Sequence, residues 1–456
     1  MQNLDCGVIQ GAFPAVSENM INATIGKRNG AARNIAVVGA GITGLSCAWL
    51  LGQSHNVTLF EAEPRLGGHS HTVEVEGMAV DTGFIVYNEP AYPNLTAFFS
   101  HFGVATEATD MSFSVSLHDG ALEYSGASLR GLFAQPVNAL RSRFWSMLID
   151  LLRFYRQAPG AVAALGDMSL RSYLRQGGFG DAFLHDHLYP MVAAVWSCPL
   201  GMAGDLPAAA FIRFCNNHGL LKLTRRPVWR TVQGGSRNYV QKLRAGFSGI
   251  VHSGTPVTAV RRHGSLVELA LPGGTANFDD VVLACHADQA FALLADPSPL
   301  EREIIGTFRT TRNEVVLHSD AAAMPKGRAA WAAWNYMSGG DEGAVTYWMN
   351  RLQNLPPERQ WFVTLNSPWP LRGVALRQSF THPVFDTAAL RAQKRIWEVQ
   401  GFNRTWFCGA WWGAGFHEDG LQAGLAVAEA LGGVRRPWRV ADESGRIPVP
   451  VLRQAP

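Results

Sequence analysis

Three glycines directly follow an apolar run, at a spacing that suits the binding of a pyrophosphate. Gly39, Gly41 and Gly44 form a Gly-x-Gly-x-x-Gly pattern after the run 35–38. The first glycine permits a tight turn, the second lets the backbone approach the phosphates, and the third lets a helix pack closely on a strand. Glu61 stands 22 positions after Gly39, where a carboxylate can accept hydrogen bonds from an adenosine ribose. The pattern predicts a dinucleotide-binding site.

The elements that must position these groups are a strand, a turn, a helix and a second strand. The apolar run 35–38 predicts the first strand, and the segment ending at Glu61 predicts the second. The phosphates would lie at the start of the intervening helix, where free N–H groups and the helix dipole favour an anion. The alternative is an ordinary βα turn that binds no ligand. The position of Glu61 at the end of the second strand favours a nucleotide-binding site.

A second glycine turn follows Glu61, which a simple NAD-binding domain does not need. Arg65, Gly67 and Gly68 complete the pattern Glu-x-x-x-Arg-x-Gly-Gly. In this segment the chain resembles the FAD-binding superfamily of flavin amine oxidases, protoporphyrinogen oxidases and phytoene desaturases. The segment WFCGAWWGAGFHEDGLQAGLAVAEAL also resembles the closing flavin-binding segment of that superfamily. The resemblance implies that FAD is the cofactor.

The pattern and the resemblance together assign the cofactor contacts. In the resembling families the segment 80–88 approaches the isoalloxazine ring, and the residue equivalent to Val257 meets the adenine through its backbone. A helix starting near Asp419 and Gly420 would direct its dipole at the flavin and stabilise negative charge on the reduced ring. The expected cofactor-binding residues are Gly39, Gly41, Gly44, Glu61, Ala62, Arg65, Gly67, Gly68, His69, Thr82, Gly83, Phe84, Val257, Cys285, Gly409, Asp419, Gly420 and Leu421.

Three histidines are candidate acid or base groups, because imidazole titrates near neutral pH. They are His69, His71 and His417. His417 is our candidate for the catalytic proton acceptor, with a hydrogen-bonded structural histidine as the alternative. Asp81 is expected to brace its loop rather than act as a base.

Two departures from the amine-oxidase pattern bear on the substrate. His69 stands where many amine oxidases have arginine after the double glycine. Those enzymes also commonly place a lysine near flavin N5, but the corresponding segment RTTRNEVVLHSD contains none. Amine oxidation is therefore not implied.

A closer resemblance extends from about residue 34 to residue 433. The chain is similar to bacterial proteins described as predicted NAD/FAD-binding, in motifs such as DTGFIVYN, RPVWRTVQGGSRNYV and VTYWMNRLQNL. Such proteins are associated with cyclopropane-fatty-acyl-synthase-like methyltransferases, which implies a lipid substrate and a lipid methyltransferase partner. We expect an oxidoreductase, an oxidase or desaturase, that dehydrogenates a modified fatty acyl chain by hydride transfer to flavin N5. A soluble-amine oxidase, a non-redox flavoprotein mutase and a non-catalytic FAD-binding partner remain open.

The segment RSRFWSMLIDLLRFYRQ has polar residues every three or four positions and a broad apolar face. Arginines flank that face, as in helices that lie at an anionic lipid surface. Peripheral membrane contact is one interpretation. A helix of the substrate-domain core is the other.

Composition excludes some other classes. The net charge of +3, from 39 basic and 36 acidic residues, argues against a nucleic-acid partner. The six cysteines form no CxxC pair, which favours a reducing compartment and no bound metal. We see no apolar segment typical of a secretory signal peptide and none long enough to span a membrane. We therefore expect a cytoplasmic protein, with any membrane contact at the inner face of the membrane.

The predicted fold class is α/β. A Rossmann-like FAD-binding domain of the glutathione-reductase type would be interleaved with an α+β substrate domain. We expect a flexible leader over 1–30, the FAD-binding domain over 31–89, 226–300 and 401–435, the substrate domain over 90–225 and 301–400, and a C-terminal tail over 436–456.

Overall fold

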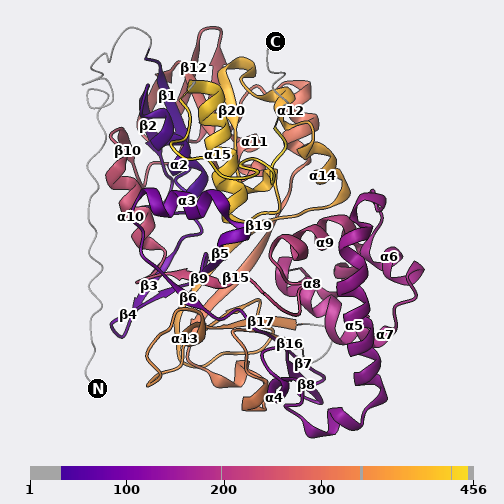
Figure 1. Ribbon diagram of the computed structural model, residues 1–456. Helices are drawn as coiled ribbons and strands as arrows, with labels where there is room; N and C mark the ends of the chain where they lie inside the picture. The colour runs from indigo at the N-terminus through magenta and orange to yellow at the C-terminus, as the bar shows by residue number, and fades with distance from the viewer. Residues whose placement is uncertain (1–31, 197, 339–342, 433, 450–456) are drawn as a thin grey trace.

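The computed structural model describes residues 32–196, 198–338, 343–432 and 434–449. The leader expected over residues 1–30 lies outside the described residues. Two parts can be followed in Figure 1: a parallel sheet with its helices at the top, and a second sheet with a group of helices below. The predicted α/β class is confirmed.

The upper part is built on a five-stranded parallel sheet that draws its strands from distant stretches of chain. Its order is β10-β2-β1-β14-β20, and every neighbouring pair is parallel. The strands are β1 (Asn34–Val38), β2 (Asn56–Phe60), β10 (Ile250–His252), β14 (Asp280–Leu283) and β20 (Thr405–Phe407). All four residues of β14 are buried, as predicted for the segment DDVVLACHA. An antiparallel sheet of β11 (Ala259–His263), β12 (Leu266–Leu271) and β13 (Gly274–Phe278) lies between β10 and β14 in sequence.

Two helices cross very closely on this sheet. They are α2 (Ile42–Leu51) and α15 (His417–Gly432). A Cβ added at Gly420 would lie 2.6 Å from Thr43 Oγ1, and one added at Gly424 would lie 2.4 Å from the Thr43 carbonyl oxygen. Only glycine allows this approach, which places the start of α15 beside the start of α2.

The lower part is built on a seven-stranded sheet of order β19-β15-β18-β17-β16-β7-β8. Its pairs are antiparallel except β16 with β7. The strands are β7 (Phe113–Leu117), β8 (Leu122–Ser125), β15 (Thr310–His318), β16 (Trp334–Ser338), β17 (Gly343–Trp348), β18 (Phe362–Leu365) and β19 (Val374–Pro383).

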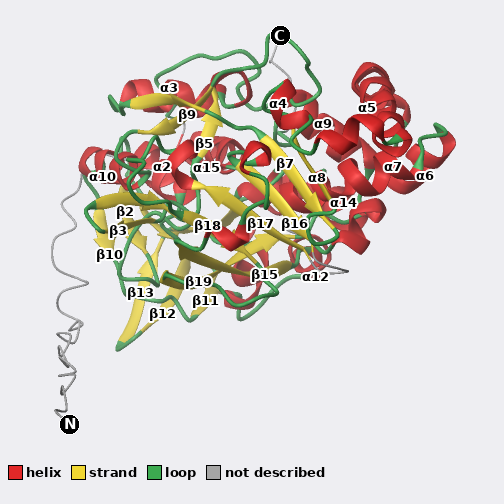
Figure 2. Ribbon diagram, turned by 90° about the horizontal axis from the view of Figure 1, so that it is seen from below, coloured by secondary structure: helices red, strands yellow, loops and turns green. Residues whose placement is uncertain are grey.

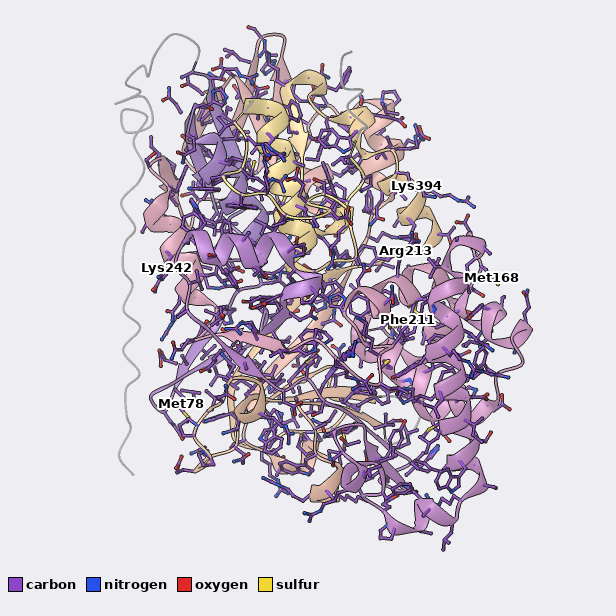
Figure 3. All side chains as sticks on the ribbon, viewed as in Figure 1. Met78, Met168, Phe211, Arg213, Lys242 and Lys394 are labelled. Carbon is purple, nitrogen blue, oxygen red and sulfur yellow. The ribbon has the colours of Figure 1, made fainter. Side chains whose placement is uncertain are left out.

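Helices between residues 129 and 217 group at one side of this sheet, as Figure 2 shows. They are α4 (Leu129–Leu132), α5 (Ser142–Ala161), α6 (Leu170–Gln176), α7 (Asp181–Phe183), α8 (Tyr189–Trp196) and α9 (Ala208–Asn217). Phe211 lies fully buried in the centre of this group, whereas Lys394 points outward (Figure 3). The remaining helices are α3 (Pro93–His101), α10 (Arg237–Gly246), α11 (Ala287–Leu293), α12 (Pro299–Ile304), α13 (Met349–Leu352) and α14 (Thr387–Gln393).

Two small sheets join the parts. They are β3 (Thr72–Val75) with β4 (Met78–Asp81), and β9 (Trp229–Val232) between β5 (Val86–Asn88) and β6 (Thr106–Thr109). The fully buried Asp81 carboxylate accepts hydrogen bonds from Thr72 Oγ1 (2.5 Å), Ser236 N (3.0 Å) and Gln353 Nε2 (2.9 Å). Asp81 therefore braces its loop, as expected, and ties together three segments far apart in sequence.

The segment 434–449, part of the expected C-terminal tail, packs on the upper part. Arg436 is buried and pairs with Glu429 at 2.7 Å, and Trp438 stacks on Trp49 of α2. Within the residues that the structure describes, no helix is long and apolar enough to cross a membrane.

Asp81 generates a prediction about pH. Burial raises the pKa of Asp81 from 3.8 to about 6, so the folded state binds this proton more tightly than the unfolded chain does. The stability that Asp81 contributes is therefore complete below about pH 4 and is lost as the pH rises through 6. Relative to Asp81→Asn, the free energy of unfolding of the wild type should fall by about 2 kcal/mol between about pH 4 and pH 7. Urea unfolding at both pH values measures this difference, and a pH-independent difference would contradict it.

Candidate cofactor and active site

The first glycine turn is shaped to receive an anion. Gly39 has a φ of +102° between β1 and α2, so the turn requires glycine there. Gly41 is the residue before α2, no side chain caps the helix, and its first turn holds no acid. A Cβ at Gly41 would have no heavy atom within 4 Å, whereas one at Gly44 would lie 1.8 Å from the Gly39 carbonyl oxygen. Open space and uncapped N–H groups fit a pyrophosphate.

The second glycine turn lies against the first. Gly67 N donates to the Ala40 carbonyl at 2.8 Å, and a Cβ at Gly68 would lie 3.1 Å from Gly41 Cα. Arg65 Nη1 donates to the Gly68 carbonyl at 2.9 Å, and Arg65 also pairs with Glu63. The Arg65 side chain therefore braces the turn.

The Glu61 carboxylate is held in place by two backbone N–H groups. One carboxylate oxygen accepts from Ala40 N at 2.7 Å and the other from Glu63 N at 2.9 Å. Each oxygen keeps a second lone pair for a ribose hydroxyl. Ala62, the neighbouring predicted residue, is exposed.

The segment that leads to Val257 runs beside Glu61. Glu61 N donates to the His252 carbonyl at 2.9 Å, and Thr255 N donates to the Glu61 carbonyl at 2.8 Å. Among the described residues, the N–H and C=O groups of Val257 have no hydrogen-bond partner. Buried backbone groups are almost always paired, so these two fit the polar edge of an adenine.

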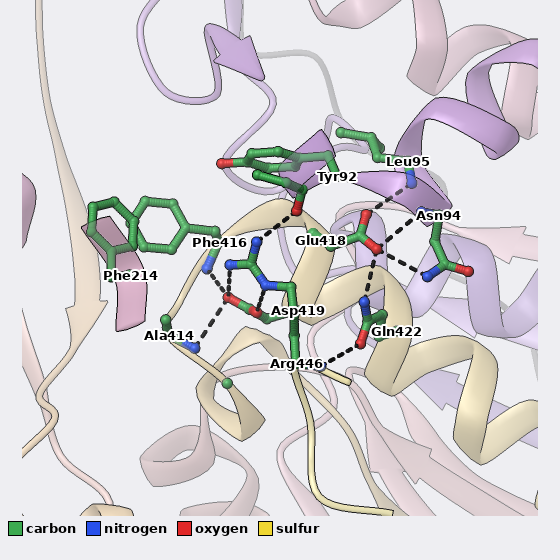
Figure 4. A network of polar contacts seen from close by, with 12 residues as sticks. Tyr92, Asn94, Leu95, Phe214, Ala414, Phe416, Glu418, Asp419, Gln422 and Arg446 are labelled. Atoms are coloured by element: carbon green, nitrogen blue, oxygen red, sulfur yellow. Dashed lines mark hydrogen bonds and ion pairs between the residues drawn. The ribbon is translucent and has the colours of Figure 1, made fainter. Parts of the chain in front are cut away.

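The opposite end of the site is the loop 409–416 with the start of α15 (Figure 4). Asp419 Oδ2 accepts from Ala414 N at 3.1 Å and from Phe416 N at 2.8 Å. The buried guanidinium of Arg446 pairs with Asp419 at 2.7 Å and also donates to the Ala91 carbonyl. The Asp419 carboxylate is thus paired with protein groups, and these contacts hold the loop 409–416 in place.

Glu418, the other acid in this turn, also accepts its hydrogen bonds from protein groups. It is fully buried and accepts from Asn94 N (3.0 Å), Leu95 N (2.9 Å) and Gln422 Nε2 (2.8 Å). The first two are N–H groups at the start of α3, so Glu418 caps that helix. Figure 4 shows both carboxylates turned toward protein partners.

The start of α15 contains the predicted residues Asp419, Gly420 and Leu421. The helix begins at His417, two residues before the predicted start at Asp419. The missing side chain of Gly420 admits α2, and the Leu421 side chain is fully buried in the main core. The small size of Gly420 and the side chain of Leu421 therefore contribute to the packing of α15. The N–H groups of the first turn of α15 remain the groups available to a flavin.

Two predicted residues meet at the carboxyl ends of β14 and β20. The carbonyl of Cys285 accepts from Trp411 Nε1 at 3.1 Å, and Gly409 gives that indole room, since a Cβ there would lie 2.2 Å from Nε1. Burial raises the pKa of the Cys285 thiol to about 12, so this group stays neutral.

The loop 82–84 lies on the segment that follows the second glycine turn. Phe84 N donates to the His69 carbonyl at 2.8 Å, and a Cβ at Gly83 would lie 2.0 Å from the same oxygen. Thr82 Oγ1 lies 2.7 Å from His71 Nδ1, and burial lowers the pKa of His71 to about 4. Gly83 is required for this loop contact.

His417 joins three parts of the site. Its Nε2 lies 3.0 Å from Ser70 Oγ and 3.1 Å from the Tyr239 hydroxyl, and its ring stacks on Phe84 with centroids 3.8 Å apart. Burial lowers the pKa of His417 to about 3, so the ring is neutral near pH 7. This environment favours a positioning role over that of a base.

Sequence reasoning missed two histidines that lie beside His69. The rings of His286 and His382 lie 5.6 and 5.5 Å from the His69 ring. Burial, followed by the neighbouring histidines, holds the pKa of His69 well below 6.5, and burial lowers the pKa of His382 to about 4. His286 follows a parallel strand at its carboxyl end, which is a signal for a site residue. No comparable signal marks His382.

Aromatic side chains cover the loop before α15. Phe416 stacks on Phe214 of α9 with centroids 4.7 Å apart, and the His218 ring lies 5.4 Å from Phe416. Phe416 packs against both the main core and the core of the helical group. The two parts of the protein therefore meet at an apolar surface next to the start of α15.

Known proteins share both sequence and fold with this chain. The family model described as flavin containing amine oxidoreductase matches residues 42–314. A flavin-containing monoamine oxidase of Mycobacterium tuberculosis is 28% identical over 285 residues, 59% of this chain and 60% of that protein. Protoporphyrinogen oxidase 2 of Arabidopsis thaliana is 37% identical over 94 residues, 20% of this chain and 17% of that protein. The chain thus matches about three fifths of the length of the monoamine oxidase.

Solved structures extend the likeness to most of the chain. A fatty acid isomerase from P. acnes has a TM-score of 0.64 at 16% identity, covering 88% of this chain and 98% of that one. Cyclohexylamine oxidase from Brevibacterium oxydans has a TM-score of 0.63 at 14% identity, covering 88% and 100%. At these identities the likeness shows the fold alone.

Gly41 offers a test of the phosphate site that is separate from folding. Gly41→Val adds a side chain where the structure leaves open space, at an ordinary φ of −71°. We expect a folded protein that binds FAD at least a hundredfold more weakly, a loss of about 3 kcal/mol. Calorimetric titration with FAD and circular dichroism measure the two properties. Gly201→Val, at another open glycine, is the control and should keep FAD. Wild-type affinity in Gly41→Val would contradict the site.

Proposed function

Because the chain belongs to the flavin-containing amine oxidoreductase family, we propose that it is an FAD-dependent oxidoreductase that dehydrogenates a hydrophobic substrate such as a modified fatty acyl chain. The glycine turns, Glu61 and the free backbone groups of Val257 support FAD as the cofactor. Bound FAD would supply the acceptor for a hydride. The residues of this chain would bind both molecules, exclude water and position the reacting carbon.

The observation that carries the choice of substrate is the charge state of the site. The carboxylates of Glu418 and Asp419 accept hydrogen bonds from protein groups. Burial lowers the pKa values of His69, His382 and His417, so these rings are neutral near pH 7. An ammonium group brought into such a site would lose its hydration without gaining a carboxylate. An uncharged acyl chain would instead gain from the contact with Phe416 and its neighbours.

The proton released from the substrate needs an acceptor other than His417. With a pKa of about 3, this imidazole holds a proton weakly near neutral pH. Its hydrogen bonds to Ser70 and Tyr239 and its stacking on Phe84 favour a role in holding the loop 82–84. A solvent hydroxide ion or a buffer base, each a stronger base than this imidazole, would therefore take the proton.

Amine oxidation is the second candidate, supported by the name of the Mycobacterium tuberculosis relative. The segment RTTRNEVVLHSD, which becomes β15, contains no lysine. A lipid-modifying methyltransferase stays the partner that the lipid proposal expects. The name of this relative does not change our preference for an acyl chain as the substrate.

Anaerobic titration separates the candidates. Vesicles of phospholipids with methyl-branched or unsaturated acyl chains should bleach the bound flavin, because a hydride leaves the acyl chain. Primary amines and polyamines should leave it oxidised. The absorbance spectrum of the flavin measures both. Bleaching by amines alone would favour amine oxidation. A flavin that stays oxidised with every lipid and amine would contradict both proposals.

A substitution tests the role of His417. His417→Ala removes the ring beneath Phe84, so we expect weaker flavin retention and a free energy of unfolding lower by about 1–3 kcal/mol. The pH profile of flavin reduction should keep its shape. Rapid-mixing absorbance across the pH range measures the profile, with His252→Ala as a control away from the loop 82–84. Loss of an ionisation from the profile would restore His417 as the base.

A further inference from the structure

Helix α5 buries only part of its apolar surface. Its buried side chains are Phe144, Met147, Asp150, Phe154 and Ala158. On another side, Trp145, Ile149 and Leu152 are 46%, 63% and 50% exposed. The spacing i, i+4, i+7 places these three on one line along the helix. The broad apolar face seen in the sequence is thus divided between the core and the surface.

A short 3₁₀ helix with further exposed apolar side chains, η2 (Pro136–Leu140), directly precedes α5 in the chain. Val137 and Leu140 are 47% and 86% exposed, and side chains three residues apart in a 3₁₀ helix point the same way. The Trp145 indole donates to the Ala139 carbonyl at 2.9 Å, which joins the two segments. We call Val137, Leu140, Trp145, Ile149 and Leu152 the α5 stripe.

The α5 stripe is a concentration of exposed apolar side chains. Among the described residues, fourteen large apolar side chains are exposed, and five of them form the stripe. The other nine are spread over residues 129–449. Scattered exposed apolar residues are ordinary, but a contiguous group marks an interaction surface. In Figure 1, α5 lies on the outer side of the molecule, away from the parallel sheet.

The charges around the stripe are positive. Residues 126–158 contain five arginines and one acid, Asp150, which is buried and pairs with Arg153 at 3.1 Å. Arg143 is neutralised by Asp186 at 2.7 Å. In the described part of the chain, Arg130 and Arg156 have no carboxylate partner, and Arg156 continues the line one turn after Leu152.

A basic loop flanks α5. Lys222, Arg225 and Arg226 are exposed and, within the described ranges, unpaired with any carboxylate. Leu220 and Leu221, directly before this loop, belong to the same apolar cluster as Leu151 and Tyr155 of α5, so the loop lies close to α5. The loop follows α9, whose Phe214 stacks on Phe416 beside the candidate site.

We propose that the α5 stripe docks on an anionic lipid bilayer. The apolar side chains would enter the boundary between headgroups and acyl chains, and the unpaired basic side chains would meet lipid phosphates. The unpaired basic side chains beside the stripe outnumber the exposed Asp181, which lies near Arg143, so the excess positive charge matches an anionic lipid surface in sign. The exposed ring of Trp145, whose N–H is already bonded to the Ala139 carbonyl, suits the apolar side of this boundary. This docking does not depend on the redox chemistry of the site.

Vesicle sedimentation of the full chain tests the proposal. Wild type should bind vesicles of equal phosphatidylcholine and phosphatidylglycerol, and bind phosphatidylcholine alone at least about tenfold more weakly, because each basic side chain near an anionic surface contributes. Ile149→Glu with Leu152→Glu should reduce binding to the mixed vesicles at least about tenfold. Leu266→Glu with Phe402→Glu, at exposed sites 41% and 51% accessible on the upper part, should leave it unchanged.

Three outcomes would overturn the proposal. Wild type could fail to bind the mixed vesicles, or the stripe variant could bind them as well as wild type does. Alternatively, wild type could form dimers in sizing chromatography that the stripe variant abolishes, which would assign the stripe to a second copy of the chain. Circular dichroism and flavin content establish that both variants are folded. Because no substrate or reduction is involved, the outcome is independent of the anaerobic titration.

Discussion

The close packing of α15 on α2 is the constraint on which the site depends. Without side chains at Gly420 and Gly424, the two helices meet at backbone distance. Their first turns then lie side by side at the carboxyl edge of the parallel sheet. One start is left open for phosphate, and the other is anchored by buried carboxylates. The N–H groups of both helix starts can therefore face the same bound ligand.

The contacts that anchor α15 also explain why no unpaired carboxylate of its first turn faces the site. Acids in the first turn of a helix commonly stabilise it through the dipole. Here Glu418 reaches instead to the start of α3, and Asp419 reaches to its own loop and to Arg446. The N–H groups of α15 are therefore not neutralised by a side chain within the site. A positive helix end next to neutral histidines and Phe416 suits the stabilisation of negative charge on a ligand.

Patterns within one short stretch of chain could be read from the sequence. The strand, turn and helix around Gly39 and Gly44, and the bracing role of Asp81, are confirmed because each depends on local spacing or on a familiar segment. The positions of His382, Arg446 and Gln353 could not be read, because their partners lie dozens to hundreds of residues away. The ion pair of Asp419 with Arg446 could not be read for the same reason, whereas its hydrogen bonds from Ala414 N and Phe416 N are local. The candidate site residues themselves stay predictions until a ligand is bound.

The C-terminal segment gives the protein a particular order of assembly. Arg446 lies near the last described residue, yet its guanidinium holds Asp419 and the Ala91 carbonyl together. The strands of the parallel sheet come from residues 34 to 407, and Arg446, which holds the loop before α15 through Asp419, comes later in the chain. During synthesis the loop before α15 can therefore be held in this way only after residue 446 has left the ribosome. Chains that stop before residue 446 would contain the glycine turn at Gly39 but would lack the Arg446 contacts that hold Asp419 and the Ala91 carbonyl together.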